Sequence, residues 1–217
     1  MKRKTISVAF TIIAAISLTV GLFGCGKKPE NEVPTPAEIT TAALTTSVAV
    51  TSKPPETKPI IEGSIKVKDV EIQKSETKVV LSDLGLTDED ITELSELKYL
   101  EHLVLDNNDI TDISVLSGLK SLKILSVMNN NITDVSPLSE LVGLEFLDLD
   151  NNQISDLSPI AGLVELKRLF FVNNKVTDVE FVRGMTKLIW LDFKGNSVSN
   201  INPVGALQNN LRYLRTK

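Results

Sequence analysis

A 22-residue repeat fills the C-terminal half of this 217-residue chain. Two series of identical residues recur at that period: Leu100, Leu122, Leu144, Leu166 and Leu188, and Asn108, Asn130, Asn152, Asn174 and Asn196. A fixed internal period of this length is typical of solenoids and other repeat proteins. The period therefore takes precedence over every local signal and predicts an array of stacked units.

Each unit has the form L-x-x-L-x-L-x-x-N-x-I-x-x-I-x-x-L-x-x-L-x-x, as in LEHLVLDNNDITDISVLSGLKS and LEFLDLDNNQISDLSPIAGLVE. Its seven apolar positions contribute about 14 kcal/mol when buried, at about 2 kcal/mol each. Ordering about 22 residues costs at least as much. One unit is therefore not expected to fold alone, whereas stacked units share their faces and fold cooperatively.

This pattern resembles the leucine-rich repeat family, and the element I-[ST]-D resembles the internalin-like branch found in bacterial surface proteins. The element occurs as Ile110-Thr-Asp112, Ile132-Thr-Asp134, Ile154-Ser-Asp156 and Val176-Thr-Asp178, and it becomes Val198-Ser-Asn200 in the last unit. The resemblance covers residues 79–217. It implies an α/β fold: a leucine-rich repeat solenoid with a parallel β-sheet on its concave face, short helical turns of 3₁₀ type on its convex face, and an N-terminal cap.

We place the cap in residues 60–99, and five full repeats with a partial last one in residues 100–217. Residues 65–67 and 70–72 alternate like short strands. After Leu86-Thr87-Asp88, which matches the repeat element, the next apolar residue comes two positions late. We expect this longer turn to carry a true helix.

The C-terminal end departs from the period, because Leu211 stands one position later than the repeat requires. The sequence contains no recognisable C-terminal cap. Internalins usually close with an immunoglobulin-like domain, which is not found here. We therefore expect the last strand to expose an edge or to pair with another copy.

Two polar positions of the repeat have a structural interpretation. The asparagine series, Asn108 to Asn196, lies where the chain turns out of its strand, so the side-chain amide can satisfy backbone groups that the turn leaves bare. The aspartate of I-[ST]-D can cap a one-turn helix. Pro137, Pro159 and Pro203 fit at the start of such a helix.

Alternation within each strand predicts which side chains face a partner. Leu103 and Leu105 stand for the positions that point into the core, so the third, fifth and seventh positions of a unit line the concave face. The residues predicted to contact a partner are Val104, Asp106, Ile124, Met128, Phe146, Asp148, Asp150, Arg168, Phe170, Val172, Trp190, Asp192 and Tyr213.

Four of the eight aromatic residues that follow residue 24 fall on this face: Phe146, Phe170, Trp190 and Tyr213. Exposed aromatic clusters mark binding surfaces, although strands favour aromatic residues in general. An acidic group borders them, consisting of Asp106, Asp148 and Asp150. A partner with apolar anchors and some basic residues would complement this face.

The N-terminus has the form of an export signal over residues 1–24. Three basic residues precede an uncharged apolar run over residues 6–23. The sequence Leu22-Phe23-Gly24-Cys25 resembles the lipobox of bacterial lipoproteins, in which the cysteine sulfur receives a diacylglyceryl group and the signal is cut before the cysteine. This resemblance implies lipidation of Cys25 and a membrane-anchored protein on the extracytoplasmic side. The alternative is a retained transmembrane anchor, since the run is nearly long enough to span a bilayer.

Residues 25–59 are predicted to be a disordered stalk behind the lipidated cysteine. Residues 27–59 contain six Pro, seven Thr and no aromatic residue, so they cannot bury enough apolar surface to fold. Their length corresponds to about 30 Å as a flexible coil and up to about 100 Å when extended. O-glycosylation of the threonines remains open.

Composition excludes several classes of function. One Cys and one His rule out an internal disulfide framework, a thiolate metal cluster and a multi-histidine metal site. The net charge is -5, and without residues 1–24 the chain keeps 20 basic against 28 acidic residues. Such a balance lacks the basic surface that nucleic acid requires.

Two chemical alternatives are weak. His102, Ser126 and Asp148 imitate a catalytic triad only in outline, because neither a nucleophile elbow nor an oxyanion hole is suggested. Residues 106–112 begin like a calcium loop but lack the Gly at its sixth position and the acidic residue at its twelfth. We therefore predict no enzymatic activity, no metal and no cofactor.

The sequence favours a lipid-anchored, adhesion-like surface module that binds another protein or a peptide through its concave face. Two alternatives remain: a structural envelope component that self-associates through its C-terminal edge, and a carbohydrate-binding adhesin.

Overall fold

The computed structural model describes residues 61–207 and 209–216. The predicted signal (1–24), Cys25 and the predicted stalk (25–59) lie outside the described residues. Within the described part, no helix has the length and apolar character that crossing a membrane requires.

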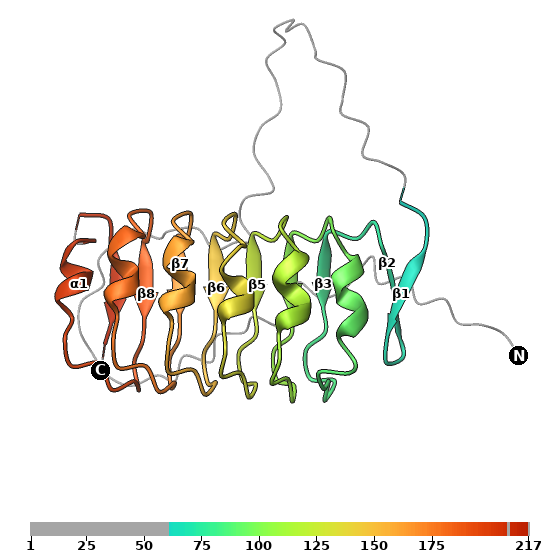
Figure 1. Ribbon diagram of the computed structural model, residues 1–217, viewed down its shortest axis with the longest axis horizontal. Helices are drawn as coiled ribbons and strands as arrows, with labels where there is room; N and C mark the ends of the chain where they lie inside the picture. The colour runs from blue at the N-terminus through green and yellow to red at the C-terminus, as the bar shows by residue number, and fades with distance from the viewer. Residues whose placement is uncertain (1–60, 208, 217) are drawn as a thin grey trace, which may run out of the picture. The chain divides into compact units, whose positions relative to one another are not determined.

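Seven short parallel strands form one side of the repeat array (Figure 1). They are β3 (Lys78–Val80), β4 (His102–Val104), β5 (Ile124–Ser126), β6 (Phe146–Asp148), β7 (Arg168–Phe170), β8 (Trp190–Asp192) and β9 (Tyr213–Arg215). Their order in the sheet is their order in the chain. From β4 to β8, neighbouring strands pair at equivalent repeat positions, as Ile124 and Phe146 do. The predicted parallel sheet is confirmed.

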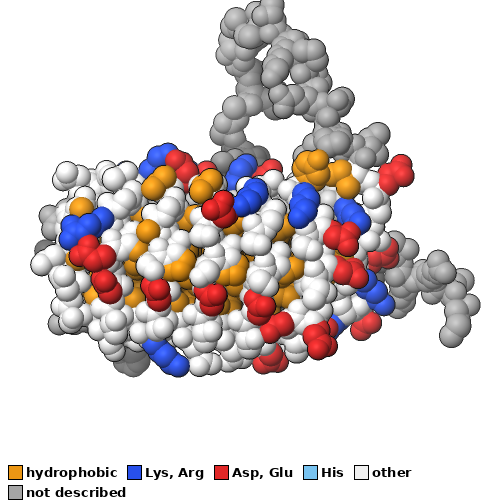
Figure 2. Space-filling model, in the orientation of Figure 1, with side chains coloured by type: hydrophobic (Ala, Val, Ile, Leu, Met, Phe, Trp, Pro, Cys, Tyr) orange, Lys and Arg blue, Asp and Glu red, His pale blue; other side chains and the backbone are white. Residues whose placement is uncertain are grey.

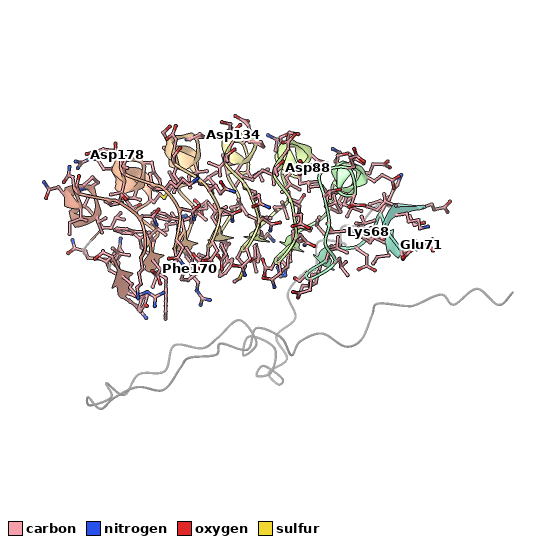
Figure 3. All side chains as sticks on the ribbon, turned by 90° about the horizontal axis from the view of Figure 1, so that it is seen from below. Lys68, Glu71, Asp88, Asp134, Phe170 and Asp178 are labelled. Carbon is pink, nitrogen blue, oxygen red and sulfur yellow. The ribbon has the colours of Figure 1, made fainter. Side chains whose placement is uncertain are left out.

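Short helices line the opposite side. Five are 3₁₀ helices: η2 (Thr92–Glu96), η3 (Ser114–Gly118), η4 (Ser136–Leu138), η5 (Ser158–Gly162) and η6 (Glu180–Gly184); the sixth is the four-residue helix α1 (Asn202–Gly205). The predicted 3₁₀-type turns are confirmed, and Figure 3 shows them along the edge opposite the strands.

From η3 to α1, the Asp or Asn that ends each I-[ST]-D element accepts a hydrogen bond from the first backbone N–H of the helix. The Asp156 carboxylate accepts a hydrogen bond from the backbone N–H of Ser158, at 2.8 Å. Equivalent bonds run from Ser114 to Asp112, Ser136 to Asp134, Glu180 to Asp178 and Asn202 to Asn200. Figure 2 shows acidic side chains in a row on this helix-bearing side of the molecule.

The core lies between the two layers and is aliphatic along most of its length. The five leucines from Leu100 to Leu188 are fully buried. Near the C-terminal end, the rings of Phe171 and Phe193 stack with their centroids 5.4 Å apart, and Phe171 also contacts Phe181. Successive repeats thus continue each other's core.

The region before residue 100 contains an antiparallel hairpin, β1 (Ser64–Val67) with β2 (Val70–Gln73). Ile65, Val67 and Ile72 of this hairpin are buried. Strand β3 lies within the segment predicted as cap, yet it joins the sheet, with Lys78 opposite His102.

The prediction of a true helix after Asp88 is wrong. The segment carries η2, a five-residue 3₁₀ helix like those of the other repeats. The two additional residues make a turn instead, in which the Asp90 carboxylate accepts hydrogen bonds from the backbone N–H and the hydroxyl of Thr87, at 2.8 and 2.9 Å. This local turn absorbs the extra length without extending the helix.

At the other end, the slip in the period is taken up before β9. Trp190 pairs with Tyr213, one residue beyond the 22-residue step, so the parallel register is kept. Among the described residues, β9 pairs with β8 alone. The side chain of Leu214, at the centre of β9, is 44% exposed.

Candidate functional site: the concave face

The candidate site is the outward surface of the sheet, which we call the concave face. It consists of the first and third residues of each strand and the second residue beyond each strand. The middle residue of each strand from β4 to β8, such as Leu125 of β5, is fully buried. The alternation along the strands thus separates the core from the concave face.

Two aromatic pairs occupy the half of the concave face formed by β6 to β9. Phe146 and Phe170 lie with their ring centroids 5.7 Å apart. Trp190 and Tyr213 stack at 4.8 Å. Phe170 is labelled on the strand side in Figure 3, away from the helices. The rings therefore form two apolar pairs over four strands, with Arg168 in register between Phe146 and Trp190.

Arg168 adds a positive charge beside these rings. Its guanidinium carbon lies 6.0 Å from the centre of the Trp190 ring, within the range of a cation–π interaction. Because β7 and β9 flank β8 on opposite sides, Trp190 lies between Arg168 and Tyr213. Protein groups thus lie over both faces of the indole.

Three partly buried carboxylates lie beyond the rings, toward β4. Asp106 accepts hydrogen bonds from the Ser126 hydroxyl at 2.6 Å and from the Met128 N–H at 3.1 Å. Asp148 accepts the N–H of Asp150 at 3.0 Å. Asp150 accepts the N–H of Val172 at 2.6 Å. These bonds hold each carboxylate at the end of its strand.

Burial and mutual repulsion shift the titration of these carboxylates. Burial raises the pKa of Asp148 to about 7, with further contributions from Asp150, Asp106 and Asp192. Burial likewise raises the pKa of Asp150 to about 6 and raises that of Asp106. These carboxylates therefore keep their protons to a higher pH than exposed carboxylates do, because their charged forms are poorly solvated.

No ion pair within the described part of the chain involves these three carboxylates. The nearest basic group that acts on them is Arg215, which lowers the pKa of Asp150. Arg215 forms its own ion pair with Asp192, at 2.7 Å. The three carboxylates thus share no dedicated counter-ion.

Most predicted contact residues lie partly exposed on the concave face, but two are buried. Val172 is 8% exposed and Asp192 is 4% exposed. Asp192 is covered because it lies in register between Phe170 and Arg215 and pairs with the latter. These two residues support the surface and present little of their own.

Sequence reasoning missed the contribution of β3. Val80 is 48% exposed and lies in register beside Val104, so it extends the concave face by one strand. The signal in the sequence was weak, because the residue equivalent to the repeat leucine Leu100 is the polar Glu76, and it stands 24 rather than 22 residues earlier. Only the short run Val79-Val80-Leu81 matches the strand pattern.

The grouping of His102, Ser126 and Asp148 is not assembled. His102 lies opposite Ile124 in the sheet, and Ser126 lies opposite Val104. The Ser126 hydroxyl donates to Asp106. In the described residues, no group of three His, Cys, Asp or Glu side chains could hold a metal ion.

The repeating asparagines connect successive units below the concave face. In Asn152, the side-chain NH₂ donates to the carbonyls of Val127 and Leu149, both at 3.0 Å, and the side-chain oxygen accepts the N–H of Ile132 at 3.0 Å. Asn108, Asn130, Asn174 and Asn196 make the same type of bonds.

The asparagine before each of these was not assigned a role from the sequence. Asn107, Asn129, Asn151 and Asn173 all have positive φ, between 52° and 58°, and Gly195 takes this position in the next repeat with φ 76°. Asparagine and glycine are the residues that best tolerate this left-handed conformation. In each Asn-Asn pair, the first asparagine thus allows the turn, and the second makes the hydrogen bonds between units.

Comparison with known sequences agrees with this geometry. The family described as Leucine Rich repeats (2 copies) matches residues 98–140 and 142–184. The fold is a leucine-rich repeat solenoid. An internalin (inlF) from Listeria monocytogenes has a similar structure, with a TM-score of 0.63 and 33% identity over 67% of this chain. The chain spans 43% of the length of that internalin.

Leucine-rich repeat ectodomains of plants are also similar. One is the plant peptide hormone receptor RGFR1, solved in complex with RGF2, with a TM-score of 0.58 and 26% identity over 67% of this chain and 25% of the receptor. Another is the receptor kinase GASSHO1/SCHENGEN3 from Arabidopsis thaliana, solved in complex with CASPARIAN STRIP INTEGRITY FACTOR 2, with a TM-score of 0.56 and 28% identity over 64% of this chain and 18% of the receptor. No curated protein is similar enough to count as a match.

Proposed function

We propose that this protein is an adhesion-like binding module of the bacterial cell surface, which holds another protein or a peptide against the concave face of its leucine-rich repeats. The observation that carries the proposal is the pairing of aromatic side chains at positions that the core does not use. Phe146 contacts Phe170, and Trp190 stacks on Tyr213. Aromatic anchors supply much of the affinity at protein interfaces. No catalytic role is proposed.

The similar plant receptors support this kind of ligand. Both were solved in complex with a second molecule, which for RGFR1, a peptide hormone receptor, is RGF2. The identity of 26% and 28% extends over a fraction of each receptor. Binding by this chain is therefore inferred from its own surface, and the receptors show a related fold in such complexes.

The size of the concave face favours a peptide segment. Seven strands at about 4.8 Å spacing extend over about 30 Å. With three outward residues for each repeat, the face is small beside the roughly 800 Å² that each partner buries in a standard interface. An extended segment of a partner chain would match a face of this length and narrow width.

We further propose that the array is displayed from the membrane by a lipid on Cys25 and the stalk of residues 25–59. Two acyl chains, at about 0.8 kcal/mol for each buried methylene, hold a protein stably on a bilayer. Growth with labelled palmitate tests the anchor. The wild-type chain is expected to take up label and to lose residues 1–24, and Cys25→Ala to do neither. A wild-type chain that retains residues 1–24 and carries no label would indicate a transmembrane anchor instead.

Selection of a displayed random peptide library on the full chain in detergent micelles tests the binding function. The wild-type chain is expected to enrich peptides, and the variant Phe146→Ala/Phe170→Ala/Trp190→Ala to lose that enrichment. The matched control is Val142→Ala/Val164→Ala, which removes apolar side chains that are 58% and 44% exposed outside the concave face. Enrichment that survives the aromatic changes would place binding elsewhere.

Self-association through β9 is the second candidate, because β9 pairs with one described strand only and exposes Leu214. Sedimentation of the full chain distinguishes self-association through β9 from ligand binding at the concave face. A dimer that persists in the aromatic variant and disappears in Leu214→Asp would favour the structural role. The carbohydrate alternative is less suited to the geometry, since Arg168 and Tyr213 occupy both faces of Trp190, and sugars stack on a free ring face.

A further inference from the structure

Charges are segregated along the concave face. Asp106, Asp148 and Asp150 lie over β4 to β6, and no described basic side chain forms an ion pair with them. On the other half, Arg215 is neutralised by Asp192, and Arg168 lies against the Trp190 ring. The face also carries the exposed Lys78 on β3 and Lys194 beyond β8. Its unpaired carboxylates are therefore gathered near β5, and its basic groups lie on the strands to either side.

The carboxylates surround the outward side chains of β5. Ser126 lies in register between Val104 and Asp148. Met128 follows two residues later, and its N–H donates to Asp106. Asp106 and Asp150 occupy equivalent positions on the two flanking repeats, about 10 Å apart at two strand spacings. Met128 holds the equivalent position on the repeat between them and is partly buried. An ammonium or guanidinium group would therefore lie over Met128 and reach carboxylates on both sides.

An apolar surface adjoins these carboxylates directly. Asp148 lies opposite Phe170 in the sheet, and Phe170 contacts Phe146. Lysine and arginine side chains lay their aliphatic stems along apolar surface while the charged end reaches a polar group. The same cation can also interact with the face of an aromatic ring.

We infer that the concave face recognises an extended peptide segment in which a lysine or arginine stands beside an apolar residue. The basic group lies over Ser126 and Met128, between Asp106 on one side and Asp148 with Asp150 on the other. The neighbouring apolar side chain lies on Phe146 and Phe170. This inference rests on the proposed function and specifies the chemistry of the partner.

Charge complementarity makes this occupant preferable to an acidic or purely apolar one. An acidic segment would add charge to carboxylates that are already partly desolvated and unpaired, which costs free energy. A purely apolar segment would cover them and leave them without a counter-ion. A basic group supplies that counter-ion and fixes the register of the segment on the face.

The test is the peptide selection on the full chain in detergent, carried out with EDTA so that no divalent cation takes part. The informative variant is Asp148→Asn/Asp150→Asn. Asparagine has the same size, and its carbonyl oxygen still accepts the N–H groups of Asp150 and Val172. The control, Glu89→Gln/Asp109→Asn, removes the same charge at exposed positions outside the concave face.

Peptides selected by the wild-type chain are expected to be enriched in lysine or arginine next to an apolar residue. The double Asn variant is expected to lose the basic preference and keep the apolar one, and to bind a wild-type-selected peptide at least about tenfold more weakly, or about 1.4 kcal/mol. The control variant is expected to match the wild-type chain.

Peptides without a basic preference, or an unchanged preference in the double Asn variant, would overturn the inference. That outcome would leave the proposed function intact if the selection still depends on Phe146, Phe170 and Trp190. Selection that ignores these three residues, or a wild-type chain that enriches no peptide, would instead overturn the proposed function and the inference with it.

Discussion

At the scale of single residues, the side chain of one asparagine satisfies three backbone groups from successive turns of the solenoid. Asn152 donates to Val127 and Leu149 and accepts from Ile132. These backbone groups lie in the interior, where water cannot replace the amide. The strict 22-residue spacing of the asparagine series follows from this requirement.

Replacing Asn152 with alanine is expected to lower the free energy of unfolding by about 2 to 4 kcal/mol, because buried donors and acceptors lose their partner. Urea denaturation followed by circular dichroism measures the change. Asn131→Ala is the control, since Asn131 is exposed and accepts one bond from the exposed Gln153. Equal effects of the two substitutions would contradict the structural role of Asn152.

Asp148 gives the fold a distinctive pH dependence. Its pKa is about 7 in the folded chain against an ordinary value of 3.8, so the folded state binds a proton more tightly than the unfolded state. Stability from this proton is complete below about pH 4 and is lost as the pH rises through about 7. Asp106, Asp150 and Asp192 face Asp148, and Arg215 acts on Asp150.

Asp148→Asn mimics the protonated form at every pH. The variant is therefore expected to exceed the wild-type chain in stability by about 1 to 2 kcal/mol near pH 8, and this gain is expected to shrink toward pH 4. Thermal unfolding across this pH range measures the difference. A variant that is less stable than the wild-type chain near pH 8 would show that the Asp148 charge is well compensated.

The role of the second asparagine in each pair could be predicted from the sequence, because its period and the need to satisfy turning backbone coincide. The role of the first could not. The first asparagine of each pair is required by its positive φ, as in Asn107, Asn129, Asn151 and Asn173. In the sequence, it recurs with the same period as its neighbour, so the two roles cannot be told apart. Gly195 at the equivalent position was the available signal.

At the scale of elements, the 3₁₀ helices depend on the aspartate that precedes each of them. Asp156 accepts from the N–H and the hydroxyl of Ser158, at 2.8 and 2.9 Å. Asp156→Ala is expected to lower the free energy of unfolding by about 1 kcal/mol, the usual net contribution of a hydrogen bond, because the first N–H of η5 loses its acceptor. Chemical denaturation checks it, with Asp156→Asn as the control that keeps an acceptor. An unchanged midpoint in Asp156→Ala would mean that packing alone holds η5.

The elements themselves could be predicted where the period is regular and not where it breaks. Strands β4 to β8 follow from the alternation of each unit. The helix expected near Leu94 is instead η2, because the two inserted residues close a turn around the Asp90 carboxylate. The sequence shows that two residues are inserted, but it does not predict the conformation that they adopt.

At the scale of the whole molecule, the stacking of units and the outward residues of the sheet follow from periodicity. Periodicity does not predict how far each outward residue is buried. Val172 and Asp192 occupy predicted surface positions but are buried. Asp192 is covered by Arg215, with which it forms an ion pair. The burial of an outward side chain depends on the directions of the side chains in adjacent repeats, and the repeat pattern does not predict those directions.

The signal, the lipidated Cys25 and the stalk also belong to this scale, and they remain proposals. They define where the concave face would be presented. The array would supply the binding surface, and residues 25–59 would supply its distance from the membrane.

The fluorescence of Trp190 tests the central claim most directly. It is the single tryptophan of the chain, and it lies on the concave face between Arg168 and Tyr213. Titration of the full chain with a peptide from the selection is expected to shift the Trp190 emission to shorter wavelength, because the bound segment excludes water from the indole. Saturable binding of that peptide without any change in Trp190 emission would contradict binding at the concave face.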